Sequence, residues 1–187
     1  MYPKLRSHFE KIVTLTDDEF EAVASYFSFK TLRKHQFLVQ QGEAVQNDFW
    51  VVSGLLKAYY LAPNGKEHIL QFAMEDWWIT DYQAYFGKTS AQLNVNCLED
   101  TQVLCLSLEN REKICSNFQK IDTFFRKKAN AGYVALQKRI LSLLNDNPKE
   151  RYTQFLTLYP TLLQRIPKTL IASYLGVSRE TLSRLNQ

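Results

Sequence analysis

The C-terminal segment of the chain carries the side chains whose types and spacing best suit a chemical task. Residues 167–175 and 178–185 have apolar positions at helical spacing, and Gly176 lies at the turn between them. Ser178 is a preferred N-cap residue, and Glu180 lies in the first turn, where an acidic side chain is stabilised. Two short helices that cross at a glycine turn are typical of the helix-turn-helix, whose second helix enters the DNA major groove. The segment therefore predicts recognition of double-stranded DNA.

Three charged side chains of the second helix, Arg179, Glu180 and Arg184, would face the edges of the bases. An arginine can donate two hydrogen bonds to guanine, and a glutamate can accept one from cytosine. The side chains expected to contact DNA phosphates are Lys168, Thr169, Ser178 and Ser183. The alternative is an ordinary helical hairpin with charged residues on its surface.

The charge of the chain is divided unevenly between its two parts. Residues 1–125 carry 12 basic and 16 acidic side chains, a net charge of −4. Residues 126–187 carry 11 basic and 3 acidic side chains, a net charge of +8. Such an asymmetry indicates an acidic body joined to a part that binds an anion such as DNA, although a solvated basic helix face would give the same numbers.

The rest of the chain offers no local motif for catalysis or metal binding. Gly87-Lys88-Thr89 resembles the end of a phosphate-binding P-loop, but Tyr82 stands where the first glycine of that loop must be. The three histidines are scattered, and the three cysteines lack the clustered spacing of iron–sulfur sites. No Ser-His-Asp, Cys-His or paired-carboxylate motif is visible. We therefore expect no enzymatic activity, no metal and no cofactor.

Length and composition limit the class of protein further. At roughly 100–200 residues per domain, a chain of 187 residues forms one domain or two small ones. No run approaches the roughly 18 apolar residues of a membrane span, and residues 1–20 are too polar for a secretory signal. The odd number of cysteines indicates reduced thiols. We expect a cytoplasmic protein without a membrane partner.

The elements that position these residues can be predicted from the periodicity of apolar side chains. Two short helices are expected before residue 28, the second capped by Thr16. Between residues 30 and 108, short runs of β-branched and aromatic residues alternate with turn signals, which predicts an antiparallel sandwich or barrel-like roll. Asn64-Gly65 is the strongest hairpin signal. A further helix is expected over residues 149–163, with Pro160 interrupting or ending it.

A long helix is predicted between the roll and the C-terminal helices, from about residue 117 to residue 144. Its apolar stripe includes Phe125, Ala129, Gly132, Leu136 and Ile140, spaced by threes and fours. Such a stripe is either the seam of a dimer or a spine buried within one chain. We favour the seam, because the small domain that precedes the helix offers too little surface to bury seven turns.

The order of these motifs resembles one known family. Gly42-Glu43, residues 49–54 and Pro63–Glu67 resemble the β-roll of the cyclic nucleotide-binding fold. Together with the long helix and residues 178–184, they resemble the catabolite-activator/FNR-type (Crp/Fnr) bacterial transcription regulators over nearly the whole chain. Residues 172–176, Ala-Ser-Tyr-Leu-Gly, resemble a subgroup common in Bacteroidetes-type bacteria.

The resemblance implies an α+β fold with an antiparallel, jelly-roll-type β-roll, a long dimerisation helix and a C-terminal helix-turn-helix. The implied divisions are a sensor roll at 1–116, a dimerisation helix at 117–145 and a DNA-binding domain at 146–187, with its recognition helix at 178–186. The family's base-reading triplet matches the three charged residues named above. The implied partners are a palindromic DNA operator, a second copy of the chain, RNA polymerase and a small-molecule effector.

Two departures from the family pattern affect these expectations. Family members that bind cyclic nucleotides use a Gly-Glu pair and an arginine to hold the phosphate and the ribose. The matching positions of this degenerate pocket, with the flanking tryptophan, are Trp78, Ile79, Thr80 and Ser90. Without the arginine a buried phosphate would lack its counter-charge, so we predict no useful binding of cyclic AMP. The chain also ends at Gln187, before the β-hairpin wing of the family, which predicts fewer phosphate contacts.

Five aromatic residues crowd the degenerate pocket: Trp77, Trp78, Tyr82, Tyr85 and Phe86. They either form core and close the site, or stack around an apolar or aromatic ligand. The sequence as a whole predicts a dimeric, DNA-binding transcription regulator. The alternative is a dimeric β-roll sensor or interaction module that has lost productive DNA binding.

Overall fold

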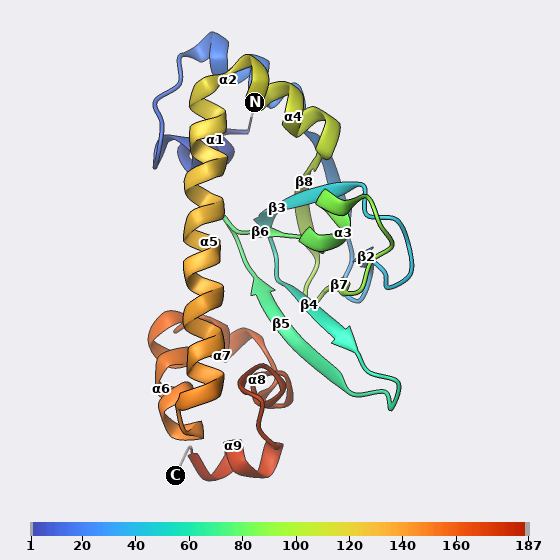
Figure 1. Cartoon of the computed structure of the whole chain (residues 1–187), viewed down its shortest axis with the longest axis vertical. Coiled ribbons are helices and arrows are strands. Elements are labelled where there is room, and N and C mark those ends of the chain that lie inside the picture. The colour runs from blue at the N-terminus through green and yellow to red at the C-terminus, as the bar shows by residue number, and fades with distance from the viewer. Residues whose placement is uncertain (1, 186–187) are drawn as a thin grey trace.

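The fold is described from a computed structural model that covers residues 2–185, so Met1, Asn186 and Gln187 lie outside the described residues. Two antiparallel four-stranded sheets form a β-roll, with the strand orders β1-β8-β3-β6 and β2-β7-β4-β5 (Figure 1). The strands are β1 (Ser28–Leu32), β2 (Phe37–Val39), β3 (Asn47–Ser53), β4 (Leu56–Leu61), β5 (Glu67–Ala73), β6 (Trp78–Ile79), β7 (Asn94–Cys97) and β8 (Thr101–Ser107). The roll confirms the predicted jelly-roll type.

Helices surround the roll and extend beyond it. They are α1 (Pro3–Glu10), α2 (Asp17–Ala24), α3 (Tyr82–Gly87), α4 (Leu108–Asn117), α5 (Gln119–Asn145), α6 (Pro148–Leu158), α7 (Leu162–Arg165), α8 (Lys168–Leu175) and α9 (Arg179–Leu185). The 27-residue helix α5 runs along one side of the molecule, with α1 and α2 near one end and α6 to α9 near the other (Figure 1). The predicted long helix and C-terminal helices are thus confirmed.

Local sequence signals account for several of these boundaries. Thr16 and Glu19 form a reciprocal capping box at the start of α2, and Asn147 forms another with Glu150 at the start of α6. Each box satisfies backbone N–H groups that the first helical turn cannot pair. Pro160 follows the end of α6, where a proline cannot continue the helical hydrogen bonds, and α7 begins after it.

Two glycines fix tight turns of the roll. Gly65 has φ +81° and donates its N–H to the carbonyl oxygen of Ala62 at 2.9 Å, which closes the predicted β4–β5 hairpin. Gly54 has φ +106°, and a Cβ atom there would lie 2.5 Å from Oγ1 of Thr101. Only glycine combines this conformation with so close an approach of two backbone segments.

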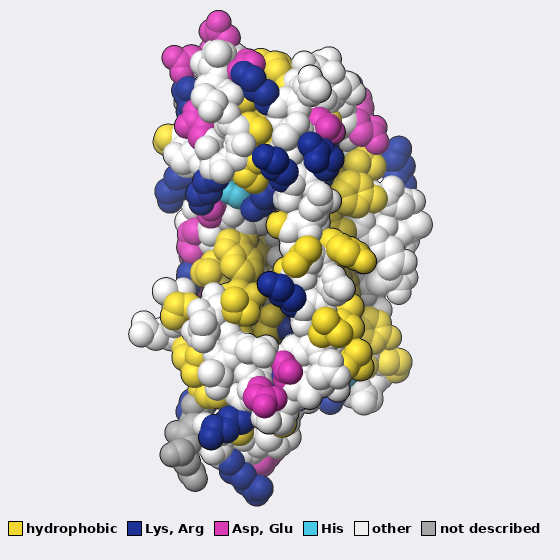
Figure 2. All heavy atoms as spheres, turned by 60° about the vertical axis from the view of Figure 1, so that its left-hand side comes forward, with side chains coloured by type: hydrophobic (Ala, Val, Ile, Leu, Met, Phe, Trp, Pro, Cys, Tyr) yellow, Lys and Arg dark blue, Asp and Glu magenta, His cyan; other side chains and the backbone are white. Residues whose placement is uncertain are grey.

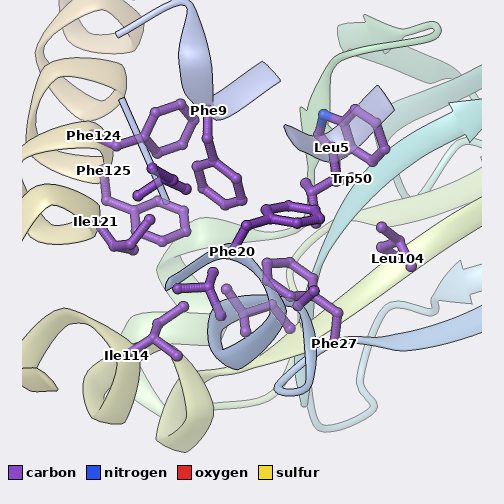
Figure 3. Close-up of a cluster of buried hydrophobic side chains, with 14 residues drawn as sticks. Leu5, Phe9, Phe20, Phe27, Trp50, Leu104, Ile114, Ile121, Phe124 and Phe125 are labelled. Carbon is purple, nitrogen blue, oxygen red and sulfur yellow. The ribbon is translucent and has the colours of Figure 1, made fainter. Parts of the chain in front are cut away.

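Three clusters of buried apolar side chains hold the fold together. The first joins α1, α2, α4 and the start of α5 to β3 and β8, with side chains such as Phe9, Trp50 and Phe124 pointing toward one another (Figure 3). The second fills the interior of the roll with alternate residues of all eight strands. The third contains roll residues and C-terminal helix residues together, among them Leu55, Tyr59, Ile69, Phe72, Phe155, Ile171 and Leu182. The C-terminal helices therefore share a core with the roll. No helix among the described residues has both the length and the apolar character needed to cross a membrane.

Candidate nucleic-acid interface and effector pocket

Helices α8 and α9 form the predicted helix-turn-helix. Gly176 has φ +68° between them, and the N–H of Val177 donates to the carbonyl oxygen of Ala172 at 3.0 Å, which closes the end of α8. Ser178 accepts a hydrogen bond on its Oγ from the N–H of Thr181 at 3.1 Å, as an N-cap residue does. Leu182 is buried in the third core cluster, so one face of α9 is fixed against the chain.

The exposed surface of α9 carries the predicted base-reading residues. Arg179, Glu180 and Arg184 are all exposed, and among the described residues neither arginine takes part in a salt bridge. The pKa of Glu180 is lowered, first by hydrogen bonding to its own backbone N–H and then by Ser178, which keeps the carboxylate charged. The predicted phosphate contacts are exposed as well: Lys168, Thr169, Ser178 and Ser183. Helix α9 begins at Arg179, one residue after the predicted start, and Asn186, its predicted end, lies outside the described residues.

The predicted dimer stripe on α5 divides into two parts. Ala129, Gly132, Leu136 and Ile140 are exposed, and a Cβ atom at Gly132 would meet nothing within 4 Å. Phe125 is only 5% exposed and packs on Phe9 and Trp78, so its assignment to a dimer face is wrong. The reason is that the first turns of α5 already cover the roll and α1, which makes them an internal spine.

A continuous apolar surface remains uncovered along the later turns of α5. Its exposed side chains include Tyr133, Val134, Leu136, Ile140, Leu141 and Leu144, of which Leu136 is 60% and Leu144 is 75% exposed. Figure 2 shows hydrophobic side chains gathered on the side of the molecule that carries this helix. A patch of this kind on an otherwise packed chain marks an interaction surface.

The structure does not bring the four residues of the degenerate pocket together around one cavity. Ile79 is fully buried in the second core cluster, and Thr80 donates its hydroxyl to the carbonyl oxygen of Asn47 at 2.8 Å. The indole of Trp78 packs on the first core cluster, outside the roll interior. Ser90 is exposed at an isolated bridge to Ala44. The expectation of a shared lining for these residues is therefore wrong, because core packing directs them in different ways.

Asp81 is a residue of this region that the sequence analysis missed. Its carboxylate is 2% exposed and accepts hydrogen bonds from the N–H groups of Ala84, Gln92 and Leu93 at 3.1, 2.8 and 3.0 Å. The amide of Ala84 lies in the first turn of α3, and the other two lie in the loop before β7. Three charge-assisted hydrogen bonds offset the burial of the anion. The available signal was an aspartate directly before a short helix, an N-cap pattern.

The five aromatic residues lie in three places: three on α3, where Phe86 contacts both tyrosines, and the two tryptophans apart from them. Tyr85 is buried and donates its hydroxyl to the carbonyl oxygen of Leu106 at 3.2 Å. Tyr82 and Phe86 stack on each other at the surface of α3, with ring centroids 6.1 Å apart. Trp77 contacts Tyr159 of the C-terminal helices edge to face. Core formation therefore explains Tyr85 and Trp78, and the five rings do not surround one ligand site.

One buried ion pair joins the roll to α4. The carboxylate of Asp48 on β3 is 3.3 Å from the guanidinium of Arg111, which lies over the ring of Phe125 at 4.1 Å. Burial raises the pKa of Asp48 to about 7, although the charge of Arg111 acts in the opposite direction. No group of three or more His, Cys, Asp or Glu side chains within residues 2–185 is arranged to hold a metal ion.

Residues 29–118 match the family profile of the cyclic nucleotide-binding domain. A search of curated proteins found no match. Among solved structures, FixK2 from Bradyrhizobium japonicum superposes with a TM-score of 0.72 and 19% identity, over 86% of this chain and 82% of its own. Residues 29–118 thus form a cyclic nucleotide-binding domain, and the chain shares its overall fold with FixK2.

Two further solved structures, both of regulators, share this fold. The c-di-GMP responsive global regulator CLP from Xanthomonas campestris superposes with a TM-score of 0.73 and 11% identity, over 91% of this chain and 89% of its own. A protein from Eubacterium rectale assigned to the Crp/Fnr family gives 0.69 and 16%, over 91% of this chain and 82% of its own. At these identities the likeness establishes a shared fold, and the function has to be argued from the residues of this chain.

Proposed function

We propose that this chain is a dimeric DNA-binding transcription regulator that inserts α9 into the major groove. The observation that carries the proposal is the geometry of α9. Leu182 anchors the helix in the core, and Arg179, Glu180 and Arg184 are exposed, with neither arginine in a salt bridge to another described residue. Direct readout of base edges requires a helix that is fixed in this way and presents bidentate donors at its N-terminal end.

The exposed turns of α5 support the dimeric part of the proposal. A second copy that packed its own α5 on Leu136, Ile140 and Leu144 would bury apolar surface that one chain leaves in water. Two copies related by a two-fold axis would recognise a palindromic operator. In this scheme the roll, 1–116, is the sensor, 117–145 the dimer helix and 146–187 the DNA-binding part. RNA polymerase as a further partner rests on the resemblance to regulators alone.

The effector part of the proposal is that the roll does not bind cyclic AMP. The side chain of Asp81 already engages three amides within residues 84–93, and the roll interior is packed with apolar side chains. A phosphate would meet a buried carboxylate there in place of an arginine, which is unfavourable. Isothermal titration with cyclic AMP should therefore release no binding heat. Micromolar or tighter binding would contradict this, and cyclic di-GMP, named for a regulator of the same fold, is a useful second ligand.

Selection of bound duplexes from a random DNA library by the purified protein tests the proposed function directly. We expect enrichment of one palindrome, which would report sequence reading, two-fold symmetry and half-site spacing together. Binding to it should weaken steeply with salt as phosphate contacts release counterions. If no sequence is enriched, the competing function, a dimeric sensor module without productive DNA binding, is favoured instead.

Two single substitutions separate base reading from phosphate binding. Arg179→Ala should weaken binding to the selected site by about 1–3 kcal/mol and relax the preference at one base position. Lys168→Ala should weaken binding to selected and random duplexes alike and reduce the salt slope by about one. Equal loss on both duplexes for Arg179→Ala would show that its base-reading role is wrong.

A further inference from the structure

Arg165 joins the DNA-binding helices to the roll of the same chain. It is the last residue of α7, directly before the helix-turn-helix, and its guanidinium reaches three separate turns of the roll. Its Nε and Nη2 atoms donate to the two carboxylate oxygens of Glu99 at 3.0 and 2.7 Å. Its Nη1 and Nη2 atoms donate to the two carboxylate oxygens of Glu75 at 2.8 and 3.2 Å. Nη2 also lies 3.1 Å from the carbonyl oxygen of Gly54, to which it donates.

This arrangement is rigid because the partners of Arg165 are themselves fixed. Glu75 also accepts a hydrogen bond from the N–H of Gly54 at 2.9 Å, so the carboxylate bridges the β3–β4 turn and the arginine. Burial would raise the pKa of Glu75, but the hydrogen bonds from Arg165 and Gly54 lower it to about 2, so the pair stays charged. Two bidentate carboxylates on one planar guanidinium define its orientation as well as its position.

Other contacts hold the same two parts in the same relation. The hydroxyl of Ser173 on α8 donates to the carbonyl oxygen of Glu67 at 2.6 Å. Arg139 on α5 donates to the carbonyl oxygens of Ile69 and Tyr174 at 3.1 and 2.9 Å, which ties the long helix to both β5 and α8. In this docked arrangement Arg179 and Arg184 stay exposed, so docking leaves the predicted DNA-reading face free.

We propose that Arg165, held by Glu75 and Glu99, is a positioning residue for DNA recognition: it sets the orientation of the helix-turn-helix relative to the roll and α5. The role rests on the proposed DNA binding. Two recognition helices of a dimer must meet half-sites about one helical turn, roughly 34 Å, apart. If each helix-turn-helix could swivel, only a fraction of the dimers would have that spacing, and the affinity would fall by the same fraction.

The double variant Glu75→Gln/Glu99→Gln tests this role, because its change in charge and its loss of positioning should affect DNA affinity in opposite directions. It removes two negative charges from the roll, so long-range electrostatics alone would strengthen DNA binding, whereas loss of positioning weakens it. We expect about tenfold weaker binding to the palindrome selected by the wild-type protein, and binding within about twofold of wild type to a single half-site. The wild-type protein should bind a duplex with five extra base pairs between the half-sites much more weakly than the selected palindrome. In the double variant this difference in affinity should largely disappear. The matched control Glu43→Gln/Glu112→Gln removes the same charge at two exposed carboxylates, so it should bind the palindrome at least as tightly as wild type and keep its spacing discrimination.

Hydrogen exchange of the DNA-free protein reports directly on the contact of Arg165 with Glu75 and Glu99. Amides of α7 and α8 should exchange faster than in wild type in the double variant. The same is expected in Arg165→Lys, which keeps the positive charge but loses the planar guanidinium. Arg165→Lys replaces the double variant if that one does not fold. Unchanged exchange, or unchanged spacing discrimination with a folded variant, would overturn the positioning role. If the wild-type protein selects no DNA sequence, the proposed function fails, and exchange still shows whether the contact holds the two parts together.

Discussion

The indole of Trp78 donates a hydrogen bond to the imidazole of His8, with 3.0 Å between Nε1 and Nε2. Because Nε2 is the acceptor, the imidazole proton resides on Nδ1, which donates to the carboxylate of Asp76 at 2.5 Å. Asp76 is also paired with Lys11. A neutral histidine thus connects α1 to the loop before β6 and to the aromatic residues at the start of α5.

This relationship predicts how stability depends on pH. Burial lowers the pKa of His8 from 6.5 to about 4, although the charge of Asp76 acts in the opposite direction. The unfolded chain therefore binds the proton more readily than the folded chain. The contribution of His8 to the free energy of unfolding is complete above pH 6.5 and is lost as the pH falls toward 4. Between pH 7.5 and 4.5 we expect a loss of roughly 2–3 kcal/mol from this group, measured by urea unfolding. His8→Gln should lack this part of the pH dependence, whereas His68→Gln, at an exposed site, should retain it; identical profiles for wild type and His8→Gln would contradict the prediction.

The carboxylate of Asp81 should contribute strongly to stability. Asp81→Ala leaves three amides near α3 without their acceptor, and we expect a loss of about 3 kcal/mol in the free energy of unfolding. Asp100→Ala is the control, because its exposed carboxylate accepts from the single N–H of Lys34. It should cost about 1 kcal/mol or less. Equal costs for the two variants would show that the buried network adds nothing.

The exposed half of α5 predicts a charge-sensitive dimer. Leu136→Glu places a carboxylate in the proposed seam, so light scattering should report a monomer, and circular dichroism should show unchanged helical content. Lys138→Glu places a carboxylate two residues further along, away from the stripe, and should stay dimeric although its net charge changes by more. A Leu136→Glu protein that remains dimeric would place the dimer contact elsewhere.

The turn at Gly54 should tolerate no side chain. Gly54→Ala combines φ +106° with a Cβ 2.7 Å from backbone atoms of Asp100 and Thr101, and we expect more than about 3 kcal/mol of destabilisation. Gly42→Ala has a similar φ of +89° but open space around the new methyl group, so about 1–2 kcal/mol is expected. Thermal unfolding of both variants measures the difference. Because Gly54 also contacts Arg165 and Glu75, its substitution should additionally loosen the C-terminal helices.

Much of this fold could be predicted because its signals are local. Caps such as Thr16 and Asn147, and turns such as Asn64-Gly65 and Gly176, act within a few residues of where they stand. The helix-turn-helix falls in this class, which explains why its residues lie where the sequence indicated.

The features that could not be predicted depend on residues far apart in the chain. Periodicity placed Phe125 on the apolar stripe of α5, but it cannot show which turns of that stripe another element covers. Asp81 meets amides 11 and 12 residues away across a loop, and Arg165 meets partners 66 to 111 residues away. A single polar residue in a polar segment carries no signal of such partners.

Because the third core cluster is shared, the roll stabilises the C-terminal helices whether or not it binds a ligand. Without Leu55, Ile69 and Phe72, the C-terminal helices would expose Ile171 and Leu175 to water, so these helices do not contain all of their own core. Substitutions elsewhere in the roll would leave this packing in place, whereas removal of the roll would not. The presence of the roll in the chain therefore needs no ligand to explain it.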